Sequence, residues 1–150
     1  MLLTDPAFKT ANAEYLEALE DYRKGDYGDC LTKCGSAFES TMKIICSKKN
    51  WSYKQIDTAA ALLDIIKDNT NIESYMFETF KLVATLRNRQ SKAHGAGTQP
   101  KNVSPNTARY ALGATATAVL FLETISRSAI ATRPCAFDAI CRGWLSRLAA

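Results

Sequence analysis

The chain has 150 residues and a mass of 16.5 kDa, the size of one ordinary domain built around one hydrophobic core. Hydrophobic residues make up 47% and charged residues 23% of it, a composition that excludes a disordered protein. No apolar run reaches the roughly 20 residues that a membrane-spanning helix needs, and the N-terminus lacks the features of a signal peptide. We therefore expect a cytoplasmic globular protein with no membrane partner.

Charge is distributed unevenly along the chain. Residues 1–78 hold nine Lys or Arg and thirteen Asp or Glu, whereas residues 79–122 hold six basic residues and no acidic one. The single histidine, His94, lies within this acid-free stretch. Such a stretch suits a polyanion or phosphate ligand, and an ordinary solvated basic surface is an equally open interpretation.

Helical periodicity dominates, and turn signals separate the helices. The first predicted helix spans Phe8–Lys24 and ends at Gly25. Four of its residues are expected to share one face: Tyr15, Leu16, Leu19 and Tyr22. Asp26 is expected to cap a second helix that ends near Lys49. Its apolar stripe has residues three or four positions apart: Leu31, Cys34, Phe38, Met42 and Ile45.

Two further helices are predicted before His94. Asp57 is expected to cap a helix over Thr58–Asp68, and Asn71 a helix over Ile72–Arg89. The first of these carries an apolar set: Leu62, Leu63, Ile65 and Ile66. The second carries another: Tyr75, Met76, Thr79, Val83 and Leu86.

The segment between Gln90 and Val103 contains two glycines and a proline and cannot continue a helix. Ser104–Pro105 then provides a capping hydroxyl followed by proline at the first helical position, so an alanine-rich helix is predicted to Arg127. Its small residues permit close helix approach, within the monomer or across a dimer. After Pro134, the amphipathic segment Phe137–Leu148 either packs on the bundle or belongs to an appendage.

These segments predict an all-α fold, an up-down helical bundle of four to five helices with a short C-terminal extra helix. We expect one domain over residues 1–127 and an extension over residues 128–150, helical or partly disordered. Five cysteines lack the spacing of a disulfide framework: Cys30, Cys34, Cys46, Cys135 and Cys141. A metal site at the first two would need two more ligands, so we expect reduced, buried thiols, no metal and no cofactor.

Arg87 and His94 offer a chemistry that needs no metal. Arg87 lies near the end of a predicted helix, and His94 follows seven residues later beside a glycine. When RNA is cleaved by attack of its own 2′-hydroxyl, the reaction requires a base, an acid and a cation near the phosphorane. A histidine can act as base or acid, and an arginine can be the cation. One histidine cannot easily act as both acid and base in one step, so this chemistry predicts a symmetric dimer. Spacing alone is weak support, because such pairs arise by chance.

The local sequence resembles a known signature. LRNRQSKAHG, over Leu86–Gly95, is similar to the pattern of HEPN domains, in which Arg and a polar residue, often Asn, precede a His. The chain resembles most the abortive-infection C-terminal domain of bacterial phage-defence proteins. That domain is also similar in the AFESTMK stretch, Ala37–Lys43, and in the Leu-Phe-Leu end of the alanine-rich helix, Leu120–Leu122. The resemblance covers about residues 10–125.

The resemblance implies a helical HEPN fold, a homodimer and metal-independent ribonuclease activity. Arg87 and His94 would be catalytic, and Asn88 would orient the loop or the phosphate. Glu39 either supports this site or forms an exposed ion pair with Lys43 one turn later, and both interpretations are open. Three basic residues are expected to hold RNA: Arg89, Lys92 and Lys101.

We therefore expect an endoribonuclease effector of phage defence or of a toxin–antitoxin-like system. Family members usually carry this domain at the end of a longer chain with a separate sensor or partner domain. We therefore expect that the trigger is either absent or another protein, an antitoxin or a sensor. The alternative is a catalytically inactive HEPN module that dimerises and binds RNA, nucleotide or a partner protein. The intact Arg-Asn…His pattern favours the enzyme.

Overall fold

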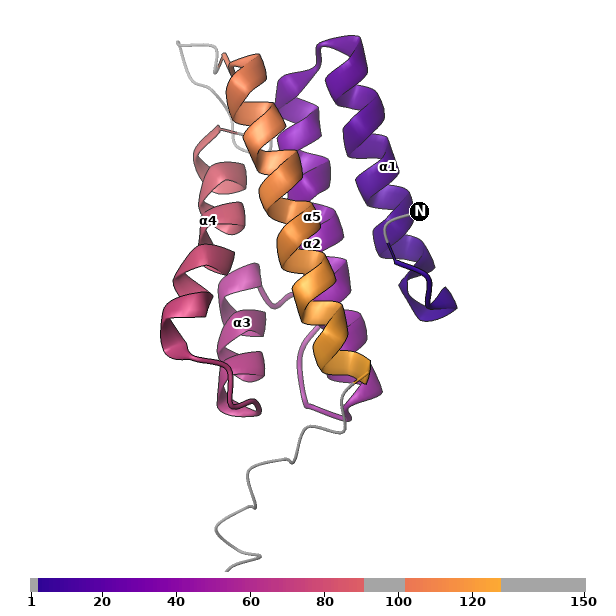
Figure 1. Cartoon of the computed structure of the whole chain (residues 1–150), viewed down its shortest axis with the longest axis vertical. Helices are drawn as coiled ribbons and strands as arrows, with labels where there is room; N and C mark the ends of the chain where they lie inside the picture. The colour runs from indigo at the N-terminus through magenta and orange to yellow at the C-terminus, as the bar shows by residue number, and fades with distance from the viewer. Residues whose placement is uncertain (1–2, 91–101, 128–150) are drawn as a thin grey trace, which may run out of the picture.

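A computed structural model describes residues 3–90 and 102–127. It consists of a short 3-10 helix, η1 (Pro6–Phe8), and five α-helices: α1 (Lys9–Lys24), α2 (Tyr27–Lys48), α3 (Ala59–Asp68), α4 (Ser74–Gln90) and α5 (Pro105–Arg127). These ranges contain no strand. Helices α1, α2 and α5 run along the long axis, and α3 and α4 flank them on one side (Figure 1). Helix α2 contacts all four other α-helices. The predicted all-α bundle is confirmed.

Three predicted helix boundaries are confirmed by their capping geometry. Gly25 ends α1 with a φ of 82°, a left-handed conformation that glycine adopts without steric cost. The Asp26 side chain accepts a hydrogen bond from the Asp29 amide at the start of α2. Ser104 Oγ accepts one from the Thr107 amide at 3.1 Å, and Pro105 is the first residue of α5.

The predicted starts of α3 and α4 are wrong by one or two residues. Thr58, not Asp57, caps α3, and the Asp57 carboxylate instead accepts a hydrogen bond from the Lys54 amide at 2.7 Å. Adjacent Asp and Thr are both good capping residues, so the sequence did not distinguish them. Helix α4 begins at Ser74, so Asn71 does not occupy its capping position.

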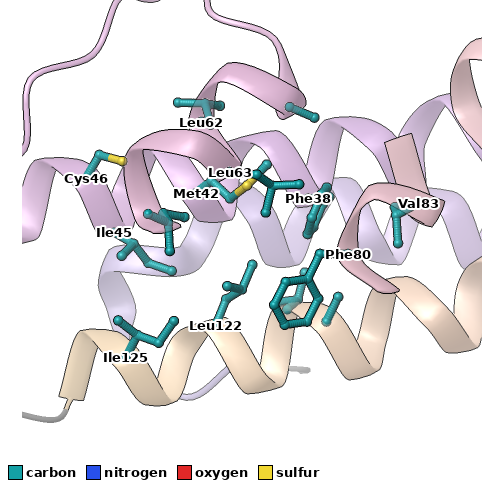
Figure 2. Close-up of a cluster of buried hydrophobic side chains, with 14 of the residues drawn as sticks. Phe38, Met42, Ile45, Cys46, Leu62, Leu63, Phe80, Val83, Leu122 and Ile125 are labelled. Atoms are coloured by element: carbon teal, nitrogen blue, oxygen red, sulfur yellow. The ribbon is translucent and has the colours of Figure 1, made fainter. Parts of the chain in front are cut away.

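The core has two parts, which meet along α2. The larger part lies between α2, α3, α4 and α5 (Figure 2) and includes Phe38, Met42, Ile45, Leu62, Leu63, Phe80, Val83, Leu122 and Ile125. The smaller part joins α1, α2 and α5 and includes Ala18, Cys30, Leu31, Cys34, Ala108 and Ala111. The predicted apolar stripe of α2 is buried as expected.

The predicted faces of α4 and α1 need correction. Tyr75 is 66% exposed and Thr79 is exposed, whereas Phe77 and Phe80 enter the core. Apolar residues occur nearly all round α4, so spacing alone allowed more than one stripe. On α1, Leu16 is exposed, although the rest of its predicted face packs on the smaller core.

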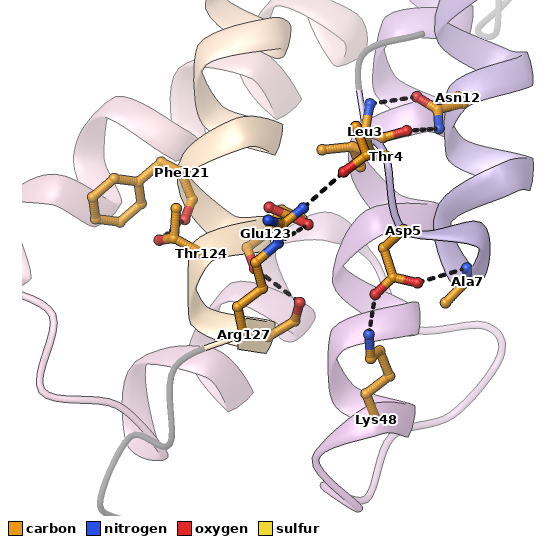
Figure 3. Close-up of polar contacts among 11 residues, drawn as sticks. Leu3, Thr4, Asp5, Ala7, Asn12, Lys48, Phe121, Glu123, Thr124 and Arg127 are labelled. Atoms are coloured by element: carbon orange, nitrogen blue, oxygen red, sulfur yellow. Dashed lines mark hydrogen bonds and ion pairs between the residues drawn. The ribbon is translucent and has the colours of Figure 1, made fainter.

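The N-terminal segment is tied to three helices (Figure 3). The Leu3 backbone exchanges two hydrogen bonds of 2.8 Å with the Asn12 side chain on α1. The Asp5 carboxylate pairs with Lys48 at the end of α2. Arg127, the last residue of α5, donates to the Thr4 hydroxyl at 2.9 Å. These contacts fix residues 3–5 on the bundle.

Cys30, Cys34 and Cys46 are buried free thiols, as predicted. A hydrogen bond with the Cys34 thiol, together with burial, raises the pKa of Cys30. Within residues 3–90 and 102–127, no three potential metal ligands cluster, and no helix is long and apolar enough to cross a membrane. Cys135, Cys141 and the predicted helix over Phe137–Leu148 lie outside the described residues. The boundary at residue 127 stays a prediction.

Candidate functional site

Three residues of the predicted site lie in the last turn of α4. Arg87 is partly buried, with its side chain 30% exposed, whereas Asn88 and Arg89 are exposed. His94, Lys92 and Lys101 fall outside the described residues, in the segment that links α4 to α5. The structure therefore gives the geometry around Arg87.

Within residues 3–90 and 102–127, the Arg87 guanidinium has two polar neighbours. One Nη donates a hydrogen bond to Asn88 Oδ1 at 3.2 Å, and the same nitrogen lies 4.0 Å from Glu39 Oε1 on α2. The Arg87 Nε is buried and has no hydrogen-bond partner among the described residues. A guanidinium has five N–H donors, and the contacts with Asn88 and Glu39 involve only one of its two Nη atoms.

Gly35, one turn before Glu39 on α2, provides the space for the Arg87 side chain. A Cβ added to Gly35 would lie 2.6 Å from Arg87 Cγ and 3.2 Å from Arg87 Cβ. Both are stem atoms close to the α4 backbone and cannot swing away as a flexible end can. The absence of a side chain at position 35 therefore lets Arg87 lie along α2.

A pocket of about 140 Å³ opens in front of Arg87 between α2, α3 and α4. Its lining includes Gly35, Phe38, Glu39, Thr58, Ala59, Ala60, Ala84, Arg87 and Asn88. The residues from α3 form its first turn, whose amides have no acceptor within the helix and whose dipole favours an anion. Arg87 and the start of α3 thus supply positive potential to one small cavity, and Glu39 is the one carboxylate that lines it among the described residues.

Lys43 does not pair with Glu39 in the structure. The Lys43 ammonium donates a hydrogen bond of 2.8 Å to the Gln55 carbonyl, in the loop before α3. Glu39, which is 24% exposed, instead faces Arg87. Of the predicted site residues, the structure brings together Arg87, Asn88 and Glu39, and leaves Lys43 with the loop.

Sequence reasoning missed two residues that shape this pocket. Gly35 lies in the interior of a helix that the sequence predicts from Asp26 to about Lys49. A glycine there is unfavourable unless another group approaches closely, so its position was a usable signal. Thr58 lines the pocket because it caps α3. Its contribution depends on how α3 packs against α4, which local sequence does not specify.

Comparison with known proteins gives one match. A family model described as a HEPN-like domain matches residues 9–126, which include α1 to α4, the segment that contains His94, and nearly all of α5. No curated protein and no solved structure matches the chain significantly.

Proposed function

Since the chain belongs to the HEPN-like abortive-infection C-terminal family, we propose that it is a metal-independent endoribonuclease acting in phage defence or in a toxin–antitoxin-like system. The observation that carries the proposal is the pocket at the end of α4, which Arg87 and the first turn of α3 line together. Directly after this helix, the chain contains its only histidine, His94.

The proposed reaction is attack of an RNA 2′-hydroxyl on the adjacent phosphorus. The bond to the 5′-oxygen of the next nucleotide breaks, leaving a 2′,3′-cyclic phosphate and a free 5′-hydroxyl. One His94 accepts the 2′-hydroxyl proton, and a second His94, from the other subunit of a homodimer, donates a proton to the leaving oxygen. Arg87 stabilises the charge on the phosphorane, because its planar fork can donate two parallel hydrogen bonds to phosphate oxygens.

The other proposed residues act around this centre. Asn88 accepts a hydrogen bond from Arg87 and holds its guanidinium near the pocket. Glu39 opposes Arg87 from α2 and limits its movement. Three basic residues bind the RNA backbone on either side of the cut: Arg89, Lys92 and Lys101. Lys43 has its own partner in Gln55, so we assign it to holding the loop before α3.

The test is an RNA-cleavage assay in EDTA with the purified chain and its His94→Ala and Arg87→Lys variants. We expect cleavage by the unmodified chain, no cleavage by His94→Ala, and a loss of roughly 100-fold or more for Arg87→Lys, which keeps the charge but lacks the fork. Products should end in 2′,3′-cyclic phosphates. Cleavage by folded His94→Ala would refute the proposal.

A second candidate function is a silent HEPN module that dimerises and binds RNA or a partner protein. The ion pair of Arg87 with Glu39 and its packing against Gly35 favour this candidate, because both also serve to join α4 to α2. Growth of a bacterial host distinguishes the two functions. The nuclease arrests growth only when His94 is intact, whereas a binding module gives the same growth with or without His94.

A further inference from the structure

An apolar groove of about 540 Å³ runs between α4 and α5, and it shares no lining residue with the Arg87 pocket. Met76 and Phe80 line it from α4, and Tyr110, Gly113 and Phe121 from α5. Tyr110 is 56% exposed, and a Cβ added to Gly113 would meet no atom within 4 Å. A groove with exposed aromatic ends and a floor of small residues has the form that accepts an apolar helix face.

We propose that residues 137–148 of this same chain form an amphipathic helix that occupies the α4–α5 groove. The apolar residues of this segment follow helical spacing: Phe137, Ile140, Cys141, Trp144, Leu145 and Leu148. Asp138, Arg142 and Arg147 occupy positions between them. The proposal concerns packing within one chain, and it stands or falls independently of the nuclease proposal.

The length of the segment matches the length of the groove. Along α5, the groove extends from Tyr110 to Phe121, which is about 16 Å at 1.5 Å per helical residue. A helix over residues 137–148 is about 18 Å long. Phe121 lies six residues before the end of α5 at Arg127, and the nine residues 128–136 reach up to about 30 Å when extended. The chain can therefore turn back and run antiparallel to α5.

The covalent link to α5 favours this segment over a second copy of the chain. A segment joined to α5 by nine residues is present near the groove at an effective concentration on the order of millimolar. A second copy must instead lose its translational and rotational freedom to bind the same surface. The antiparallel direction also fixes a register, in which Phe137 lies near Phe121 and Cys141 lies near Thr117.

That register can be tested with the native thiol of Cys141 in the full chain. Thr117→Cys places a second thiol in the groove, and Thr10→Cys places one at an exposed threonine on α1 as the matched control. On mild oxidation, we expect a monomeric disulfide between position 117 and Cys141, identified by peptide mass spectrometry. It should form at least roughly tenfold faster than any disulfide in the Thr10→Cys variant, because docking holds the first pair together.

Two outcomes of the oxidation experiment would overturn the proposal. Equal, slow oxidation of both variants would mean that the segment does not lie in the groove, and disulfide-linked dimers through position 117 would assign the groove to a second copy. A second measurement covers the case in which Thr117→Cys disturbs the fold. In the full chain, Leu145→Glu should shift the amide NMR signals of Gly113 and Thr117 but not those of α1, and unchanged groove signals would also refute docking.

Discussion

At the scale of single residues, the contact between Gly35 and Arg87 decides how α2 and α4 meet. A methyl group at position 35 would lie 2.6 Å from Arg87 Cγ, closer than non-bonded carbon atoms approach each other in proteins. Alanine nevertheless favours a helix over glycine by about 0.5–1 kcal/mol. The two effects have opposite signs, so the effect of the substitution depends on whether Arg87 is present.

We therefore predict a double-mutant cycle with a change of sign. Gly35→Ala alone should destabilise the chain by about 1–3 kcal/mol, as overpacking does. In an Arg87→Ala background, the clashing Cγ is gone, and the same Gly35→Ala should be neutral or stabilising by up to about 1 kcal/mol. Urea unfolding of the four variants gives these free energies. An equal effect of Gly35→Ala in both backgrounds would show that the two side chains do not compete for space.

The same pair predicts an effect on activity, provided that the chain is the proposed nuclease. Gly35→Ala should reduce RNA cleavage by roughly tenfold or more, because a displaced Arg87 no longer faces the pocket at the start of α3. The assay should use a temperature at which circular dichroism shows the variant fully folded. Unchanged cleavage by the folded variant would mean that Arg87 acts from a position other than the one beside Gly35.

At the scale of helices, the sequence was most informative where a cap or a turn residue is chemically distinct. Gly25, Asp26 and the Ser104–Pro105 pair predicted three boundaries, because each satisfies backbone groups that few residue types can satisfy. The face of α4 was not predictable in this way, since Tyr75 and Phe77 are both apolar and only packing decides which is buried. The pocket at Arg87 also arises from packing, between helices separated in sequence.

The capping of α3 bears on the site, because the first turn of this helix lines the Arg87 pocket. The Thr58 hydroxyl accepts a hydrogen bond from the Ala61 amide at 3.4 Å. We predict that Thr58→Ala lowers the free energy of unfolding by about 1 kcal/mol, a typical cost of removing such a cap. Thr58→Ser is the matched control and should retain most of the stabilisation that the cap provides, since serine caps equally well. Equal stability of the alanine and serine variants in thermal unfolding would show that this long hydrogen bond contributes nothing.

At the scale of the whole molecule, residues 3–5 belong to the fold, because they join the ends of helices far apart in sequence. Thr4 contacts Arg127 on α5, and Asp5 contacts Lys48 on α2. Figure 3 shows both contacts at the same end of the bundle. Fixing this end of α5 also keeps the rest of the helix in place against the core. The N-terminal segment should therefore influence the stability of the whole bundle.

The Asp5–Lys48 pair makes this influence dependent on pH. The hydrogen bond from Lys48, followed by that from the Ala7 amide, holds the pKa of the Asp5 carboxyl below its ordinary value of 3.8. A carboxyl whose pKa is lower in the folded state stabilises the protein above its unfolded pKa, and this contribution is lost as the pH falls through the folded pKa. We predict that Asp5→Asn lowers the melting temperature at neutral pH, and that the difference from the unmodified chain shrinks as the pH falls below 3.8 and through the lowered pKa of the folded state.

Lys48→Gln separates the ion pair from the backbone contact of Asp5. It removes the ammonium but leaves the Asp5 carboxylate able to accept a hydrogen bond from the Ala7 amide at 2.9 Å. If the pair provides the larger part of the effect, Lys48→Gln should reproduce most of the loss seen in Asp5→Asn at neutral pH. Because the pair is exposed to solvent, high salt should reduce that loss by screening. If Lys48→Gln instead leaves the melting temperature at neutral pH unchanged, and the Asp5→Asn difference does not respond to salt, then Asp5 acts through its hydrogen bond from the Ala7 amide alone.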